Sequence, residues 1–430
     1  MKTQRINCIS LGCSKNLVDS EVLMGKLKAA RFKVVFEDTF SPGDVVIINT
    51  CGFIKDAKEE SIDAVLNAIE AKKKGIVVAV YVMGCLTERY REEIQKEIPE
   101  ADGIFGVNQM EQIISQFDKH YPFLPSERML TTPPHYAYLK IAEGCDRTCA
   151  FCAIPLIRGR HISQPIDMLA DETKILAEKG VKELIIIAQD VSYYGIDIYK
   201  KRKLAALLEK LIAVNGIEWI RLQYLYPAAF PMDVVEIMQS SAKICKYFDL
   251  PLQHISDSIL KRMQRNITQK ETYQLIENLR TAIPEAALRT TIITGFPGET
   301  EQDFQELLHF IRDIRFDRLG VFIYSPEEDT HAFRLKDDVP EKIKMERADE
   351  IMRLQQQISL SLNTGKIGRE YKVLFDRTEN NILVGRTEFD SPEVDNEVLV
   401  ENGFQKASPG SFAQVKITSA DDFDLFGQII

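Results

Sequence analysis

The sequence lacks any long apolar run. Its longest strongly apolar stretch, Ile76 to Met83, is far shorter than the ~18 residues that a membrane-spanning helix needs. The N-terminus also lacks the pattern of a secretory signal. We therefore expect a cytoplasmic protein that has no contact with a membrane.

Clustered positive charge is scarce as well. The chain of 430 residues holds 54 Lys and Arg against 64 Asp and Glu, a net charge of −10. Because a nonspecific grip on nucleic acid is built from clustered Lys and Arg, this composition predicts no dedicated nucleic-acid surface. A basic protein partner suits the charge better. Internal repeats and low-complexity tracts are missing too, so we expect ordinary globular domains.

The chain does have eight cysteines, and these favour metal or redox chemistry because disulfides are rare in the cytoplasm. Cys145, Cys149 and Cys152 share one short loop with C-x3-C-x2-C spacing. A four-iron cluster normally takes four cysteine ligands, so three thiolates with no fourth nearby would leave one iron open. A zinc site or chance clustering is the alternative, although zinc motifs usually pair C-x2-C elements or include nearby histidines.

Short β-branched runs alternate with helical patterns from Gln4 to about Lys119. This alternation predicts a doubly wound parallel sheet with helices on both faces. The expected strands are Ile6 to Leu11, Phe32 to Phe36, Val45 to Asn49, Ile76 to Met83 and Ile104 to Val107. Ligands bind at the carboxyl edge of such a sheet.

Three further cysteines, Cys13, Cys51 and Cys85, each follow an expected strand and stand beside a glycine. Neighbouring parallel strands would bring their loops to one edge, where glycines let the backbone approach a bulky inorganic ligand. Spacing alone leaves open a second cluster or three unrelated buried thiols. Cys8 and Cys245 remain, and we expect them to be small, buried apolar residues.

A second βα series follows a proline-rich segment at residues 121–135, which is typical of a linker. Its six units predict a partial (β/α)6 barrel, related to the eight-unit TIM form, with functional residues where its strands end. The expected strands are Tyr136 to Ala142, Glu183 to Ala188, Trp219 to Leu225, Tyr247 to Leu252, Leu288 to Thr294 and Arg318 to Tyr324.

The C-terminal residues, after a long helix at about Glu341 to Asn363, alternate with period two between turns rich in Asn, Asp and Gly. They predict a small antiparallel β-barrel. The expected strands are Tyr371 to Phe375, Ile382 to Arg386, Glu397 to Val400 and Ser411 to Thr418. Residues 366–430 carry seven Lys and Arg against twelve Asp and Glu, a net charge of −5. An RNA-binding module should be basic, whereas an acidic one fits a cationic protein. The alternative is an acidic surface that only aids solubility.

The cysteine loop, with Phe151 just before its third cysteine, resembles the radical S-adenosylmethionine superfamily. The stretches Thr131 to Gly144 and Ile154 to Arg160 resemble its methylthiotransferase branch. Ser10 to Glu21 resembles the type that modifies uS12, the twelfth protein of the small ribosomal subunit. The C-terminal barrel resembles a TRAM domain, an OB-like substrate module, so the resemblance covers essentially the whole chain.

This resemblance implies an N-terminal methylthiotransferase domain (1–120), the linker (121–135), a radical S-adenosylmethionine barrel (136–365) and a TRAM domain (366–430). It also implies two 4Fe-4S clusters. S-adenosylmethionine would bind the open iron of the cluster on the Cys145 loop, and Cys13, Cys51 and Cys85 would hold the other. The expected reaction is methylthiolation of the β-carbon of an aspartate on uS12, and a radical is needed because no ordinary base removes that proton. The expected partners are uS12 or the small ribosomal subunit, an electron donor and a sulfur source.

Further side chains are candidates for the same site. Those expected at the cofactor are Phe151, Gln189, Gln253, Arg289, Gly295 and Glu299, and those expected at the substrate are Arg158, Arg160 and Asp190. Several have a plainer alternative, which is core packing for Phe151, helix capping for the two glutamines and Asp190, and a structural ion pair for Arg289. The loop from Gly295 to Glu299 is expected to be a tight turn in either case. Arg158 and Arg160 could equally be solvated loop charges.

Two other functions stay open. A tRNA-adenosine methylthiotransferase would share the chemistry, although Ser10 to Glu21 and the acidic C-terminal module count against it. A non-catalytic iron–sulfur or zinc scaffold in ribosome assembly would need neither an open iron nor cofactor cleavage.

Overall fold

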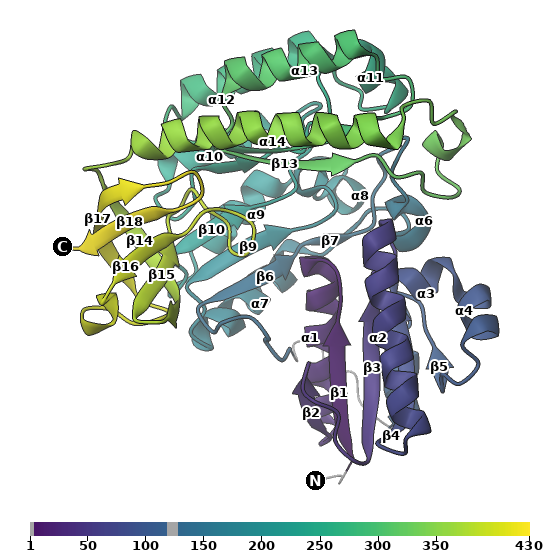
Figure 1. Cartoon of the computed structure of the whole chain (residues 1–430). Coiled ribbons are helices and arrows are strands. Elements are labelled where there is room, and N and C mark those ends of the chain that lie inside the picture. Colours follow the sequence, from purple (N-terminus) through teal and green to yellow (C-terminus); the bar gives the residue numbers. More distant parts are fainter. Residues whose placement is uncertain (1–3, 118–127) are drawn as a thin grey trace. The chain divides into compact units, whose positions relative to one another are not determined.

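The computed structural model describes residues 4–117 and 128–430 (Figure 1), so residues 121–127 of the expected linker at 121–135 lie outside the described residues. The chain forms two compact units. The N-terminal unit comprises the residues up to 132 with 143–147 and 153–162, and the C-terminal unit comprises 133–142, 148–152 and 163–430. Within the described ranges, every helix is too short or too polar to cross a membrane.

The N-terminal unit contains a five-stranded parallel sheet in the order β2-β1-β3-β4-β5. Its strands are β1 (Arg5–Ser10), β2 (Lys33–Phe36), β3 (Asp44–Thr50), β4 (Val77–Gly84) and β5 (Gly103–Ile104). The central strand β3 is buried at every residue, as expected for a parallel sheet covered on both faces. The predicted doubly wound sheet is thus confirmed.

Helices cover both faces of this sheet. Leu23 and Leu27 of α1 (Ser14–Ala29) and Ile113 of α5 (Met110–Phe117) pack on one face. Val65 of α2 (Lys55–Lys73), Leu86 of α3 (Cys85–Arg89) and Ile94 of α4 (Arg91–Glu97) pack on the other. The chain passes from β1 to β2 on one side of β1 and then from β2 to β3 on the other side. The strand order therefore reverses between β1 and β3. Ligand sites in such sheets form at that reversal.

The C-terminal unit contains the predicted partial barrel. Its six parallel strands form two hydrogen-bonded groups, β10-β9-β6 and β11-β12-β13, and a bridge between Ile220 and Ile244 joins the groups. The strands are β6 (Tyr136–Lys140), β9 (Glu183–Ile187), β10 (Trp219–Leu222), β11 (Tyr247–Asp249), β12 (Ala287–Thr294) and β13 (Arg318–Ile323). Two short strands, β7 (Ala142–Glu143) and β8 (Ile162–Ser163), flank the cysteine loop and α6 (Ile154–Arg158).

Helices surround these strands. They are α7 (Ile166–Glu178), α8 (Ile196–Tyr199), α9 (Leu204–Ile212), α10 (Met232–Ser240), α11 (Asp257–Arg262), α12 (Gln269–Ala282), α13 (Glu301–Ile314) and α14 (Glu341–Thr364). Capping boxes at Thr268 and Thr300 fix the starts of α12 and α13, because each hydroxyl accepts a backbone N–H that the helix cannot pair.

The C-terminal barrel is closed by five strands, in the order β14-β15-β16-β18-β17. They are β14 (Glu370–Glu379), β15 (Ile382–Arg386), β16 (Val398–Glu401), β17 (Phe412–Ala420) and β18 (Leu425–Ile429). The barrel prediction is confirmed, but the sequence reading missed β18. This strand pairs in parallel with β16, so the barrel is not wholly antiparallel.

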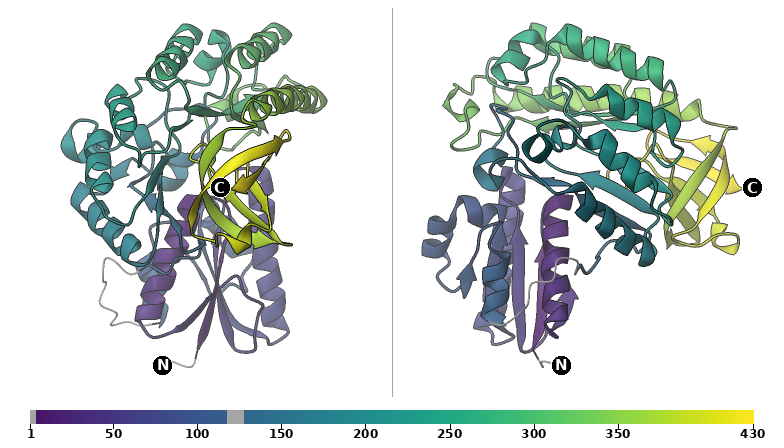
Figure 2. Two further views of the ribbon diagram at one scale, coloured as in Figure 1. Left: turned by 90° about the vertical axis from the view of Figure 1, so that its left-hand side faces the viewer. Right: turned by 180° about the vertical axis from the view of Figure 1, so that it is seen from behind.

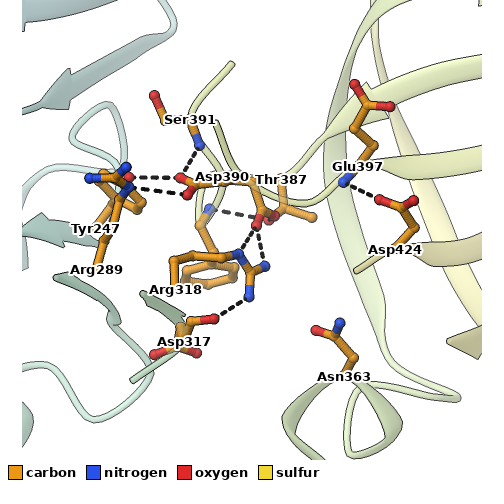
Figure 3. Close-up of polar contacts among 12 residues, drawn as sticks. Tyr247, Arg289, Asp317, Arg318, Asn363, Thr387, Asp390, Ser391, Glu397 and Asp424 are labelled. Carbon is orange, nitrogen blue, oxygen red and sulfur yellow. Dashed lines mark hydrogen bonds and ion pairs between the residues drawn. The ribbon is translucent and has the colours of Figure 1, made fainter. Parts of the chain in front are cut away.

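The loop between β15 and β16 attaches the barrel to the amino ends of the central strands (Figure 3). Asp390 is buried and accepts from Nε of Arg318, the first residue of β13, at 3.1 Å. Asp395 accepts from the Tyr247 hydroxyl at 2.7 Å and from Arg289 Nε at 3.3 Å. Views from opposite sides agree that the barrel lies beyond the tails of the central strand arrows (Figures 1 and 2).

Candidate metal centres

Cys13, Cys51 and Cys85 lie together at the carboxyl edge of the N-terminal sheet. Cys13 is the residue before α1, Cys51 directly follows β3, and Cys85 directly follows β4 and begins α3. Their strands are neighbours in the sheet. The three sulfurs are near enough for the charge of Cys13 and Cys51 to oppose the ionisation of Cys85.

Glycines let the three loops approach one another. A Cβ on Gly12, where φ is +91°, would lie 2.6 Å from Cβ of Cys51. A Cβ on Gly52 would lie 2.7 Å from the backbone nitrogen of Leu86, directly after Cys85. Neither position has room for a side chain, so these glycines serve the approach of loop to loop.

Burial keeps the Cys51 and Cys85 thiols protonated when no cation is bound, because it raises the pKa of each. It raises the pKa of Cys85 to about 12 and also raises that of Cys51, while the Arg158 guanidinium acts in the opposite direction on both. Metal ligation requires thiolates, and a bound cation supplies the charge that ionises them. Among the described residues, no three Cys, His, Asp or Glu side chains converge as ligands of a single ion do. In a four-iron cluster each cysteine binds its own iron.

Arg158, the last residue of α6, lies against this trio. Its side chain is buried, and Nε and Nη2 donate to the Cys85 sulfur at 3.4 and 3.3 Å. Nη1 donates to Asp19 at 2.8 Å and to Glu143 at 3.0 Å. Substrate contact by Arg158 stays a prediction, and in this structure the guanidinium is buried and engaged by two carboxylates. Arg160, two residues later, is exposed.

The C-x3-C-x2-C loop follows β7, and its three cysteines are all half-buried. Cys145 belongs to the N-terminal unit, where its N–H donates to the Gly159 carbonyl at 3.0 Å and its sulfur accepts the N–H of Arg147 at 3.4 Å. Cys149 and Cys152 belong to the C-terminal unit, and the Cys152 N–H donates to the Cys149 carbonyl at 3.1 Å. Half-buried thiols on a loop can accept an external ligand.

Cys149 also has a buried arginine beside it. Nη1 of Arg265 donates to the Cys149 sulfur at 3.4 Å, and the guanidinium lies 4.3 Å from the ring centre of Tyr226. The Tyr226 hydroxyl donates to the Arg265 carbonyl at 2.6 Å. No spacing or motif in the sequence marks Arg265, so its contact with Cys149 could not be predicted.

The turn after β12 carries Gly295 and Glu299. At Gly295, φ is +72°, and a Cβ would lie 2.2 Å from the Lys344 side chain. The buried Glu299 carboxylate accepts the Gly295 N–H at 2.8 Å and pairs with Arg347 at 2.7 Å. Half-buried Phe151 packs against the apolar cluster that contains Phe296 of the same turn. Phe151 of the cysteine loop and Phe296 of the turn after β12 therefore pack in the same apolar cluster.

Two glutamines and an aspartate follow other central strands. Gln253 is buried with a φ of +76°, an uncommon backbone conformation for a residue other than glycine. Gln189 is half-buried after β9, and the neighbouring Asp190 is buried and accepts the Ser192 hydroxyl at 2.5 Å. All three lie near the carboxyl ends of the strands, as expected.

Arg289 does not lie with them. It is the third of the eight residues of β12 and donates to Asp249 at 2.9 Å and to Asp395 at 3.3 Å. Cofactor contact by Arg289 stays a prediction, and in this structure its side chain forms an ion pair with Asp395, in the loop between β15 and β16, near the amino ends of the strands. The plainer alternative, a structural salt bridge, describes its contacts.

Comparison with protein-family models gives three matches. The uncharacterized protein family UPF0004 matches residues 5–106, the radical SAM superfamily matches 139–311, and the TRAM domain matches 367–430. Membership in the radical SAM superfamily implies a 4Fe-4S cluster and S-adenosylmethionine.

Among solved structures, the chain is similar to the radical S-adenosylmethionine methyltransferase TsrM from Kitasatospora setae. The TM-score is 0.54 at 13% identity, covering 95% of this chain and 80% of that one. At this identity the likeness shows the fold alone.

Full-length relatives are much closer in sequence. The chain is 55% identical to the ribosomal protein uS12 methylthiotransferase RimO of Flavobacterium johnsoniae, over 100% of this chain and 98% of the relative. It is 54% identical to the protein of the same name from Christiangramia forsetii, over 100% and 95% of the two lengths. Identity above one half along the whole sequence shows that the chain belongs to the RimO family of radical SAM methylthiotransferases.

Proposed function

We propose that this protein methylthiolates the β-carbon of an aspartate on ribosomal protein uS12, and that it does so in the cytoplasm. The observation that carries the proposal is the 55% identity to a uS12 methylthiotransferase along the whole chain. The fold agrees with it, because the structure combines a parallel-sheet unit, a partial barrel and a TRAM-type barrel in one chain.

Cys145, Cys149 and Cys152 would hold the first 4Fe-4S cluster. Three protein ligands leave one iron for S-adenosylmethionine, and when bound these groups supply the radical that an unactivated carbon requires. The chain would bind and shield them. Phe151 and the turn from Gly295 to Glu299 would line the cofactor pocket together with Gln189 and Gln253.

Cys13, Cys51 and Cys85 would hold a second 4Fe-4S cluster and serve sulfur transfer. Their common sheet edge, the close loops around Gly12 and Gly52, and the burial of Cys51 and Cys85 support this assignment. An external sulfur source and an electron donor are needed, because each turnover transfers one sulfur atom and consumes electrons.

The substrate would approach with positive charge. Residues 366–430 have a net charge of −5, which complements a basic ribosomal protein and opposes a phosphate backbone. Exposed Arg160 remains a candidate contact for a substrate carboxylate, and buried Asp190 a candidate for positioning the substrate through its neighbours.

The test compares two substrates under oxygen-free conditions. The protein, reconstituted with iron and sulfide, is incubated with S-adenosylmethionine, a reductant and either uS12 or tRNA, and the products are weighed by mass spectrometry. We expect a gain of about 46 Da on uS12, from one methylthio group replacing a hydrogen, and none on tRNA. A Cys145→Ala variant is the matched control and should give no product.

Two results would overturn the proposal. A methylthio gain on tRNA with unmodified uS12 would assign the chain to the tRNA reaction. If both clusters are intact and S-adenosylmethionine is not cleaved, the scaffold role would replace it.

A further inference from the structure

We infer that Arg158 is a positioning residue that sets the reduction potential of the cluster on Cys13, Cys51 and Cys85. The inference rests on the proposed second cluster. It concerns a side chain that cannot itself be an iron ligand, and it assigns that side chain a purpose other than substrate contact.

Two N–H groups of Arg158 point at one sulfur. Nε and Nη2 lie 3.4 and 3.3 Å from Sγ of Cys85, within hydrogen-bond range for sulfur. Ala153 and Ile157 of the same segment pack with Cys85 in one buried cluster. Because the backbone of α6 is held there by apolar contacts, the guanidinium does not depend on the sulfur for its place.

Two carboxylates and an amide fix the orientation of the guanidinium. Asp19 and Glu143 accept from Nη1 at 2.8 and 3.0 Å. Oδ1 of Asn16 accepts from Nη2, and its Nδ2 donates to the carbonyls of Leu11 at 2.9 Å and Thr50 at 3.1 Å. Leu11 lies two residues before Cys13, and Thr50 directly precedes Cys51. Asn16 therefore connects the loops of these two cysteines to the arginine that contacts the third.

The effect on a bound cluster follows from charge. Reduction adds one negative charge, and hydrogen bonds to a ligand sulfur together with a nearby positive charge stabilise the reduced form. Arg158 supplies both at Cys85 in a buried setting, where electrostatic interactions are strong. Its carboxylate partners have the opposite effect, so the potential reflects the balance between Arg158 on one side and Asp19 with Glu143 on the other.

The experiment isolates the second cluster in the full-length chain by replacing Cys145, Cys149 and Cys152 with alanine. Iron content is measured first, and the midpoint potential for one-electron reduction by dithionite is then followed by EPR. In Arg158→Met we expect iron to be retained and the potential to become more negative. The shift should correspond to at least a tenfold change in the reduction equilibrium, or about 59 mV. Arg158→Lys keeps the charge and should shift less.

Asp19→Asn gives a test of opposite sign. It removes a negative charge and leaves Arg158 in place, so the potential should become more positive. Arg128→Met is the matched control. Arg128 is also buried in the N-terminal unit and pairs with Glu21 of α1 at 2.6 Å, so its loss has a comparable structural cost but should not move the potential.

The outcomes separate the inference from its premise. If the chain with Cys145, Cys149 and Cys152 replaced by alanine binds no iron, the second cluster does not exist. Both the cluster assignment and the role of Arg158 are then wrong. If iron is bound and the potential is unchanged in both Arg158 variants, or moves equally in Arg128→Met, the role of Arg158 is wrong and the cluster assignment stands. If Arg158→Met alone loses its cluster, Arg158→Lys is the test. A more negative potential in Arg158→Lys supports the inference, and an unchanged potential contradicts it.

Discussion

Each of the two cysteine sets has a buried arginine against one of its sulfurs. The two units differ in the groups that stabilise the positive charge of that arginine. In the N-terminal unit, Arg158 contacts Cys85 and is neutralised by Asp19 and Glu143. In the C-terminal unit, Arg265 contacts Cys149, the Tyr226 ring and the carbonyl of Pro251.

The difference concerns net charge near the sulfur. An aromatic ring and a carbonyl stabilise a cation without cancelling its charge, whereas two carboxylates more than cancel it. We therefore expect Cys149 to experience the more positive surroundings. Such surroundings favour electron entry, which the proposed reaction requires at the Cys145 loop.

The largest effect should come from removing either cysteine set. Replacing Cys13, Cys51 and Cys85 with alanine should remove about half of the iron, one of two clusters, and abolish methylthio transfer while S-adenosylmethionine is still cleaved. Replacing Cys145, Cys149 and Cys152 should remove the other half and abolish cleavage itself. Iron, sulfide and 5′-deoxyadenosine are measured. Equal loss of S-adenosylmethionine cleavage in both variants would show that the two cysteine sets do not have separate functions.

Glu183→Gln tests how the C-terminal unit balances its other buried arginines. Glu183 pairs with Arg221 at 2.8 Å and also with Arg386 of the C-terminal barrel, and all three side chains are buried. Because the variant leaves buried Arg221 without its carboxylate and Arg386 with Asp376 alone, we expect the free energy of unfolding in urea to fall by roughly 3–5 kcal/mol.

Glu218→Gln is the control for Glu183→Gln. The Glu218 pair with Lys372 is about 40% exposed on both sides, so its loss should cost less than about 1 kcal/mol. Similar losses in the two variants would show that burial does not control these ion pairs.

Mild acid should weaken the C-terminal unit through His254. Burial lowers the pKa of His254 to about 4, against about 6.5 in an unfolded chain. Between these values the unfolded chain binds a proton that the folded chain does not. The free energy of unfolding therefore falls as the pH drops from 6.5 to 4, by roughly 3 kcal/mol in total.

His254→Gln should flatten that pH dependence, which urea unfolding at pH 7 and at pH 4.5 would show. His309→Gln, at an exposed side chain, is the matched control and should keep the original slope. An unchanged slope in His254→Gln would assign the acid sensitivity to other groups.

The smallest effect is expected for Arg265→Met. Losing one charge-assisted hydrogen bond of about 1.5 kcal/mol should slow reductive cleavage of S-adenosylmethionine roughly tenfold, with iron content unchanged. The formation rate of 5′-deoxyadenosine at a fixed reductant concentration is the measurement. Arg280→Met is the control, because Arg280 donates to backbone carbonyls at Ile314 and Arg315. A cleavage rate like that of the unmodified enzyme would remove Arg265 from the comparison.

Topology explains why much of this site could be predicted from sequence. A βαβ series places the ends of neighbouring parallel strands at one edge, so Cys13, Cys51 and Cys85 had to share that edge once the strands were recognised. Period-two alternation likewise indicated the C-terminal barrel. The fifth strand, β18, forms a hairpin with β17 that the sequence could have indicated, whereas its parallel pairing with β16, which is distant in sequence, could not be predicted from periodicity.

The roles of individual arginines could not be predicted in this way. Arg158 lies 73 residues from Cys85 and 139 from Asp19, and a loop arginine carries no mark of what it will meet. The structure shows that two of the stretches that carry the family resemblance, Ser10 to Glu21 and Ile154 to Arg160, meet in the Arg158–Asp19 pair. Arg289 was expected at the cofactor because it lies in a barrel strand. It is the third residue of β12, near the amino end of that strand, whereas functional residues are expected at the carboxyl end.

The place of the C-terminal barrel limits how far a substrate must reach. The barrel is fixed at the amino ends of the central strands, while the cysteine loop follows a carboxyl end, and the eight residues of β12 alone span about 25 Å. If the barrel anchors the substrate of the proposed reaction, that substrate would have to present its aspartate on an arm about that long. A short peptide around the same aspartate would gain nothing from this anchorage.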